Sequence, residues 1–202
     1  MEWVLQAYQE RKGEIASRLD EFAAVEGDEQ IFYELCFCLL TPQSNGRRCD
    51  EAVQELMKRD FYTTAVRTAQ ILRRTTRFHK HKARYLLLMK EQYPHILAMV
   101  RSGKNAEEMR AWLAEHVKGL GMKEASHFLR NIGYGEGIAI IDRHVLRNMR
   151  EQGIIQDIPK AMSEKEYLEL EGKLREFSRG IGIPLAELDL LFWSKETGRV
   201  FK

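Results

Sequence analysis

Cysteine and proline are scarce in this chain of 202 residues, and long apolar runs are absent. The three cysteines, Cys36, Cys38 and Cys49, are an odd set confined to the first quarter, which argues against a disulfide framework and a four-ligand metal site. No apolar stretch reaches the roughly 20 residues that a membrane-spanning helix needs. The first residues also lack the apolar core of a signal peptide. We therefore expect a cytoplasmic protein with buried thiols.

Charge of one sign is also lacking. The chain has 32 Lys and Arg against 30 Asp and Glu, a net charge of +2. This balance neither demands nor excludes nucleic acid, because a local patch matters more than the total. One short stretch gathers basic side chains: Arg73, Arg74, Arg77, His79, Lys80, His81, Lys82 and Arg84. It is either a solvated helix end or a surface that contacts phosphate.

Helical periodicity recurs along the chain, whereas alternating β-branched runs are few, so we expect an all-α fold. The patterns predict helices over residues 3–24, 28–41, 80–91, 94–101, 106–116, 123–131, 143–152, 164–177 and 184–195, and a further helix after Ser44 with Met57 on its inner face. Asp28 is the expected N-cap of the second helix. The expected inner face of the helix over 123–131 consists of Ala125, Phe128, Leu129 and Ile132. We expect a single domain of two helical lobes with a cleft between them. One lobe covers about residues 28–135, and the other covers about residues 1–27 and 136–202.

The most informative stretch is Val117-Lys-Gly-Leu-Gly-Met-Lys123, which joins two amphipathic segments. Its two glycines, Gly119 and Gly121, enclose one apolar residue, which favours a tight turn with positive φ and a close approach of the backbone to a ligand. The N–H groups that open the next helix, near Lys123, suit an anion such as a phosphate. Taken alone, the pattern also fits an ordinary turn between helices.

A second motif follows in Ile140-Ile-Asp142-Arg-His144-Val-Leu-Arg147. Asp142 comes after an apolar run and before a helix. A carboxylate at this place caps the helix and meets the positive end of its dipole. Asp142 alone therefore indicates an N-cap, and a chemical role depends on its pairing with the first motif.

Together the two motifs resemble those of the helix-hairpin-helix DNA glycosylase superfamily, Leu-x-Gly-x-Gly-x-Lys followed by Asp-x-His-Val-x-Arg, with Val117 in the leucine place. The resemblance implies a fold that binds DNA in its cleft. It makes Lys123 the nucleophile that attacks C1′ of a flipped nucleotide and Asp142 the residue that assists. A lysine nucleophile forms a Schiff base, so base release is expected with β-elimination at the abasic site. The resemblance places four residues at the DNA: Lys118, Gly119, Gly121 and His144.

Other features resemble the small archaeal-type 8-oxoguanine DNA glycosylase/AP lyase family, namely the chain length, the run from Lys123 to Asn131 and the terminal lysine. This resemblance implies that Trp193 and Lys202 recognise 8-oxoguanine. A tryptophan face can stack on a purine, and the terminal carboxylate can accept the N7–H that distinguishes 8-oxoguanine from guanine. Phe78 is a candidate second stacking face. Otherwise Trp193 is a core aromatic and Lys202 a solvated terminus.

The segment Leu39-Leu-Thr-Pro-Gln43-Ser resembles one in endonuclease III-like enzymes, where a glutamine fills the space left by the flipped nucleotide. Gln43 is therefore the candidate plug, unless it is simply a loop residue after Pro42. Endonuclease III itself also binds an iron–sulfur cluster near its C-terminus. No cysteine follows Cys49, which excludes such a cluster, and the expected chemistry requires no cofactor.

The expected partner is double-stranded DNA containing 8-oxoguanine, bound by a monomer that needs no membrane. Two alternatives stay open. One is a glycosylase/lyase for oxidised pyrimidines, which the missing cluster and the terminal lysine disfavour. The other is a non-catalytic helix-hairpin-helix module, in which Lys123 only contacts phosphate.

Overall fold

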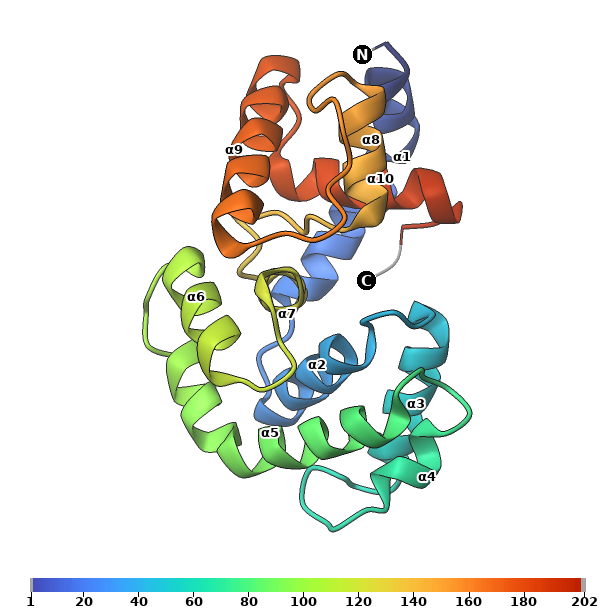
Figure 1. The fold of residues 1–202 in the computed structure, drawn as a ribbon, viewed down its shortest axis with the longest axis vertical. Helices are drawn as coiled ribbons and strands as arrows, with labels where there is room; N and C mark the ends of the chain where they lie inside the picture. The colour runs from blue at the N-terminus through green and yellow to red at the C-terminus, as the bar shows by residue number, and fades with distance from the viewer. Residues whose placement is uncertain (1, 201–202) are drawn as a thin grey trace. The chain divides into compact units, whose positions relative to one another are not determined.

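The computed structural model describes residues 2–200, apart from the side chains of Glu196 and Thr197. These residues form ten helices and no β-strand, which confirms the all-α prediction (Figure 1). Within this part of the chain, no helix is both long enough and apolar enough to cross a membrane. The chain divides into two compact units. One is Val25–Phe128, and the other combines the chain before residue 25 with the chain from Leu129 onward.

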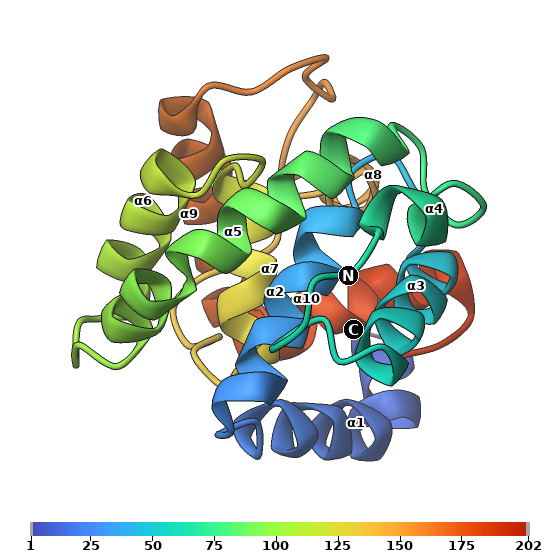
Figure 2. The same ribbon diagram turned by 90° about the horizontal axis from the view of Figure 1, so that it is seen from below.

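The Val25–Phe128 unit is built around α2 (Asp28–Leu40), whose sequence is apolar on nearly every face. A helix of this kind must be buried, and every residue from Ile31 to Leu40 except Glu34 is buried. Four more helices belong to this unit: α3 (Gly46–Lys58), α4 (Thr68–Leu72), α5 (His79–Val100) and α6 (Ala106–His116). Both α3 and α5 contact α2, and Figure 2 shows α5 crossing it. The short α4 packs on α3 and α5, and α6 packs on α5.

The other unit is organised around α10 (Leu185–Thr197). Residues 188–194 of this helix are buried except for Trp193, which is half-buried. Three helices contact α10: α1 (Glu2–Ala23), α8 (Arg143–Glu151) and α9 (Glu164–Ile181). Each unit is therefore centred on one helix that lacks a polar face, and amphipathic helices cover it.

The division between the units falls inside α7 (Met122–Asn131), after Phe128. The inner face predicted for this helix is confirmed, since Ala125, Phe128, Leu129 and Ile132 are all buried. Lys123, in its first turn, belongs to the Val25–Phe128 unit.

Helix starts follow the capping signals in the sequence. The predicted helix over 106–116 matches α6, whose N-cap Asn105 and third residue Glu108 bond each other's backbone N–H groups. Asp28, expected as an N-cap, is instead the first residue of α2, and Gly27 is the cap. Met57 was expected on the inner face of α3 but is 41% exposed.

Two expectations about helix number were wrong. The separate helices predicted over 80–91 and 94–101 are one helix, α5, with Pro94 inside it. Proline removes one backbone hydrogen bond, but Met89, Tyr93 and Ile96 stay on one buried face, and their burial favours continuation. The five-residue α4 was not predicted, because it is too short to show a periodic pattern.

Candidate active site

The hairpin between α6 and α7 is closed by a hydrogen bond from the Leu120 N–H to the Val117 carbonyl, at 3.0 Å. Gly119 has a φ of +99°, as the glycine pattern predicts, and a Cβ there would lie 2.5 Å from the Tyr85 ring. The close approach that Gly119 permits is therefore to Tyr85 of α5. Gly121 differs from the prediction, because its φ is not positive. Lys118, the remaining predicted hairpin contact, is exposed.

Lys123 is the second residue of α7 and its side chain is 26% exposed. Its Nζ lies 3.8 Å from Oε1 of Glu124. The other oxygen of Glu124 accepts the Gly121 N–H at 3.3 Å, which fixes the carboxylate against the hairpin. Sequence reasoning missed Glu124. The available signal was its position three residues after Gly121, the place from which a glutamate reaches back to a helix start.

Gln43 lies in the loop between α2 and α3, where it is exposed and has a φ of +53°. The flanking residues are bonded locally. Thr41 Oγ1 donates to the Cys38 carbonyl at 2.9 Å, and the Ser44 N–H donates to the Thr41 carbonyl at 3.0 Å. A left-handed conformation outside glycine costs of order 1–3 kcal/mol and persists only where its surroundings fix it. Gln43 is therefore held at the tip of a constrained loop.

Lys82 explains much of that constraint. It was placed in the basic surface stretch, and this interpretation is wrong for Lys82, which is only 4% exposed. Its Nζ donates to the carbonyls of Leu40, at 2.6 Å, and Pro42, at 2.8 Å, and to Ser44 Oγ, at 2.8 Å. Burial lowers the pKa of Lys82 to about 8, and Arg77 and Lys123 add to the effect.

The rest of the basic stretch is on the surface. Phe78, immediately before α5, is 52% exposed and has a φ of +55°. The Arg77 guanidinium lies 5.4 Å from the centre of its ring. The Arg77 N–H donates to Ser44 Oγ at 3.0 Å. This hydrogen bond joins the loop tip that carries Gln43 to the exposed turn that carries Phe78, and these two positions are called the Gln43 and Phe78 tips.

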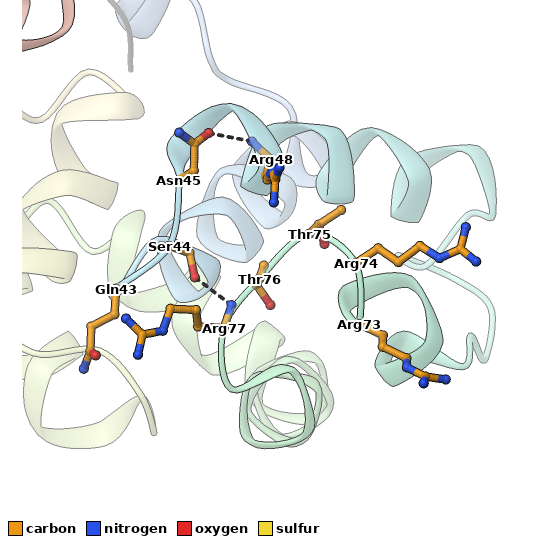
Figure 3. Close-up of a pocket in the computed structure, with 9 residues that line it drawn as sticks. All are labelled: Gln43, Ser44, Asn45, Arg48, Arg73, Arg74, Thr75, Thr76 and Arg77. Atoms are coloured by element: carbon orange, nitrogen blue, oxygen red, sulfur yellow. Dashed lines mark hydrogen bonds between the residues drawn. The ribbon is translucent and has the colours of Figure 1, made fainter.

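An open pocket of about 460 Å³ lies beside these tips (Figure 3). None of the residues that line it is acidic. The lining consists of Gln43, Ser44, Asn45, Arg48, Arg73, Arg74, Thr75, Thr76 and Arg77. Figure 3 shows the Arg77 side chain extending toward Gln43, whereas Arg73 and Arg74 extend the other way. Such a concentration of guanidinium groups suits phosphate.

In the other unit, Asp142 caps α8. Its Oδ1 accepts the N–H groups of His144, at 2.8 Å, and Val145, at 2.9 Å, which confirms the N-cap prediction. The His144 ring meets Trp193 of α10 edge to face, with centroids 6.1 Å apart. The structure thus brings Asp142, His144 and Trp193 together within this unit.

The segment that leads to Asp142 is held by side chains rather than by a strand. Its N–H groups donate to residues of α9 and α10: Ala139 to Glu171 (2.7 Å), Ile140 to Asp189 (3.4 Å) and Ile141 to Tyr167 (3.1 Å). Arg130 of α7 pairs with the buried Asp189 at 2.9 Å. Sequence reasoning missed this support, although a carboxylate inside the apolar run of α10 indicates a buried, paired group.

The predicted site residues therefore form two sets. Lys118, Gly119, Gly121, Lys123, Gln43 and Phe78 belong to the Val25–Phe128 unit, and Asp142, His144 and Trp193 belong to the other. The joint action of Lys123 and Asp142 on one nucleotide stays a prediction. The predicted specificity residue Lys202 lies outside the described residues.

Comparison with known proteins identifies the family. Residues 15–183 match the family described as Ogg-HhH, 8-oxoguanine DNA glycosylase. An 8-oxoguanine DNA glycosylase/AP lyase of Fusobacterium nucleatum is 37% identical over 210 residues, covering 96% of this chain and 94% of that protein. One of Methanocaldococcus jannaschii is 37% identical over 198 residues, with the same coverage.

Solved structures agree with the sequence relatives. The 8-oxoguanine glycosylase/lyase of Methanocaldococcus jannaschii, in complex with a 15mer DNA containing 8-oxoguanine, matches with a TM-score of 0.90 and 35% identity, covering 100% of both chains. The 8-oxoguanine DNA glycosylase of Thermotoga maritima matches with a TM-score of 0.90 and 32% identity, covering 100% of this chain and 97% of that one. With a hairpin lysine and a capping aspartate in the expected places, the chain belongs to the 8-oxoguanine DNA glycosylase family.

Proposed function

We propose that this protein is a bifunctional DNA glycosylase/AP lyase that excises 8-oxoguanine from double-stranded DNA in base excision repair. The observation that carries the proposal is a lysine in the first turn of α7, directly after the hairpin, in a chain whose relatives are named glycosylase/AP lyases. We also propose that the enzyme acts in the cytoplasm, as the sequence predicts.

The reaction begins with eversion of the damaged nucleotide from the duplex, at an unstacking cost of a few kcal/mol. In this proposal Gln43 enters the gap that the nucleotide leaves. The exposed position of Gln43 and its rigid loop support that role. Trp193 stacks on the everted purine, with Phe78 as a candidate second face and Lys202 at its edge.

The chemical step is attack by the neutral Lys123 amine on C1′. The C1′–N9 bond breaks, its electron pair leaves with the base, and the base takes up a proton. The amine loses its first proton as the bond from Nζ to C1′ forms. The C1′–O4′ bond of the sugar then breaks, the second amine proton passes to O4′, and a C1′=N Schiff base is left. Abstraction of a proton from C2′ then expels the 3′ phosphate, which cuts the strand.

Asp142 assists by stabilising positive charge that develops on the sugar and by orienting the amine. Its Oδ1 is engaged in capping α8, so the proposal assigns the reaction to Oδ2. A preorganised acceptor of this kind contributes several kcal/mol to lowering a barrier. The support of residues 139–141 by Tyr167, Glu171 and Asp189 favours a fixed carboxylate.

The proposal is tested with duplexes that carry 8-oxoguanine, thymine glycol, uracil or normal guanine. We expect release of 8-oxoguanine with a nick at the same site, and little action on the other three. Faster excision of thymine glycol would instead indicate an enzyme for oxidised pyrimidines. Binding to all four without release of any base would indicate a non-catalytic DNA-binding module.

A further inference from the structure

A buried lysine with three hydrogen bonds lies behind the exposed loop that carries Gln43. The Lys82 ammonium has three N–H donors, and three acceptors surround it: the Leu40 carbonyl, the Pro42 carbonyl and Ser44 Oγ. The acceptors span the last residue of α2 and the next four positions. One side chain of α5 therefore fixes the whole turn from α2 into α3.

The same cluster reaches the second exposed tip. Ser44 Oγ accepts both from Lys82 and from the Arg77 N–H, the residue before Phe78. Three residues other than glycine have positive φ in the described part of the chain, and two of them, Gln43 and Phe78, flank this cluster. Left-handed residues persist where surrounding contacts fix them and often occur at ligand-binding positions.

We propose that Lys82 is a positioning residue, whose buried ammonium holds the Gln43 and Phe78 tips in the conformation that enters damaged DNA. This inference rests on the proposed function and adds to it the group that preorganises the loop. Lys82 touches neither the base nor the sugar in this account. It acts through the loop, because its ammonium group binds the Leu40 carbonyl, the Pro42 carbonyl and Ser44 Oγ at the same time.

The charge of the ammonium matters as well as its reach. Leu40 ends α2, and a cation near a helix C-terminus is stabilised by its exposed carbonyls and by the helix dipole. The neutral amine keeps only two N–H donors, so it can no longer donate to all three acceptors, and its remaining hydrogen bonds lose the charge that strengthens them. The proposal therefore predicts a loop that loosens when Lys82 deprotonates.

The groups that face Lys82 from the surrounding elements are Cys49 of α3, Glu124 and Lys123 of α7, and Arg77 before α5. Burial raises the pKa of Cys49 to about 11, so its thiol stays neutral at pH 7–9. The pKa of Lys82 is lowered to about 8 from its ordinary value of 10.5. Between these two values the unfolded chain holds the proton that the folded chain releases. Deprotonation of Lys82 therefore raises the free energy of unfolding as the pH rises from about 8 to 10.5. A loss of excision in this pH range cannot then be explained by unfolding caused by the titration of Lys82.

The matched control is Lys90, two turns further along α5. Its Nζ also donates to two loop carbonyls, those of Phe61 and Thr64, but that loop carries neither Gln43 nor Phe78. Lys82→Met and Lys90→Met each remove an ammonium that ties α5 to a loop. A difference in excision activity between the two variants therefore reflects which of the two loops has lost its hydrogen bonds to α5.

The experiment compares two substrates under single-turnover conditions. One is a duplex with 8-oxoguanine, which must be opened, and the other is a single-stranded abasic oligonucleotide, which needs no eversion. We expect Lys82→Met to lower duplex excision about 10- to 100-fold, with abasic nicking near the wild-type rate. Lys90→Met should retain both. In wild type the ratio of excision to nicking should fall as the pH rises past about 8, and Lys82→Met should lack this fall.

If Lys82→Met loses excision and nicking by the same factor, or if its ratio of excision to nicking equals that of wild type, the positioning role of Lys82 is overturned while the proposed function stands. If Lys82→Met does not fold, the pH dependence of the wild-type ratio decides, and a constant ratio from pH 7 to 9.5 contradicts the inference. A wild-type protein that leaves 8-oxoguanine duplexes intact would overturn the proposed function, and this inference with it.

Discussion

Asp142 combines a structural contact with a proposed chemical one. Its Oδ1 accepts two N–H groups at the start of α8, and this contact sets the orientation of the whole carboxylate. A residue that both caps a helix and serves catalysis confuses simple alanine scanning, because the alanine removes both functions. The two can be separated by a substitution that keeps the cap.

Asp142→Asn should separate them. Asparagine caps helices as well as aspartate, so the free energy of unfolding should stay near that of wild type, whereas Asp142→Ala should lose about 1 kcal/mol. Both variants should lose excision by about 100-fold or more, because the carboxylate charge is gone. Denaturant unfolding and single-turnover excision measure the two effects. An Asp142→Asn enzyme with wild-type excision would remove Asp142 from the chemistry.

At the scale of elements, the hairpin depends on a contact with a distant helix. Gly119 has positive φ and lies against Tyr85 of α5, so the absence of a Cβ lets the hairpin pack on that helix. Gly121 lies two residues later without positive φ, and a Cβ there would meet only Glu124 Oε2 at 3.4 Å. The two glycines of the motif therefore differ in how far they tolerate a side chain.

Gly119→Ala should lower the free energy of unfolding by about 1–3 kcal/mol, through backbone strain and the clash with Tyr85. Gly121→Ala should be close to neutral. Adding Tyr85→Ala to Gly119→Ala should recover the part due to the clash, which a double-mutant cycle in urea measures. Equal losses at the two glycines would show that the hairpin geometry described here is wrong.

Local signals made the helices and part of the site predictable. The N-cap at Asp142, the limits of α6 and the inner face of α7 all depend on residues close in sequence, and the structure confirms each. Lys82 and Pro94 were wrongly interpreted because their outcome depends on partners far along the chain. Lys82 meets acceptors near residue 40, and α5 continues through Pro94 because its other residues are buried.

The support behind Asp142 could not be predicted for the same reason. The N–H groups of residues 139–141 find acceptors on α9 and α10, 26 to 49 positions away. Nothing in an apolar run such as Ile138–Ile141 specifies which distant carboxylate or hydroxyl will satisfy it. The sequence indicated only that Asp189, within the apolar α10, is buried and paired, and it did not indicate its partners.

At the scale of the whole molecule, a net charge of +2 gives little general attraction to DNA. Affinity must then depend on where the cations lie, and the pocket beside Gln43 gathers arginines with no acidic neighbour in its lining. Binding should weaken steeply with salt, because each phosphate contact releases counterions.

Arg48→Gln or Arg77→Gln should each reduce the slope of log K against log salt by about 1. Lys165→Gln is the control, because Lys165 is exposed beside Glu169 on α9 and lines no pocket described here. Fluorescence anisotropy with an undamaged duplex at several salt concentrations measures the slope. Unchanged slopes for both arginine variants would show that DNA binds elsewhere.

Borohydride trapping on an 8-oxoguanine duplex, followed by peptide mapping, tests whether Lys123 is the nucleophile. We expect a covalent adduct of the wild-type protein with DNA, attached through Lys123, and no adduct with Lys123→Gln. An adduct of equal yield in Lys123→Gln, or one mapped to another amine, would contradict that role.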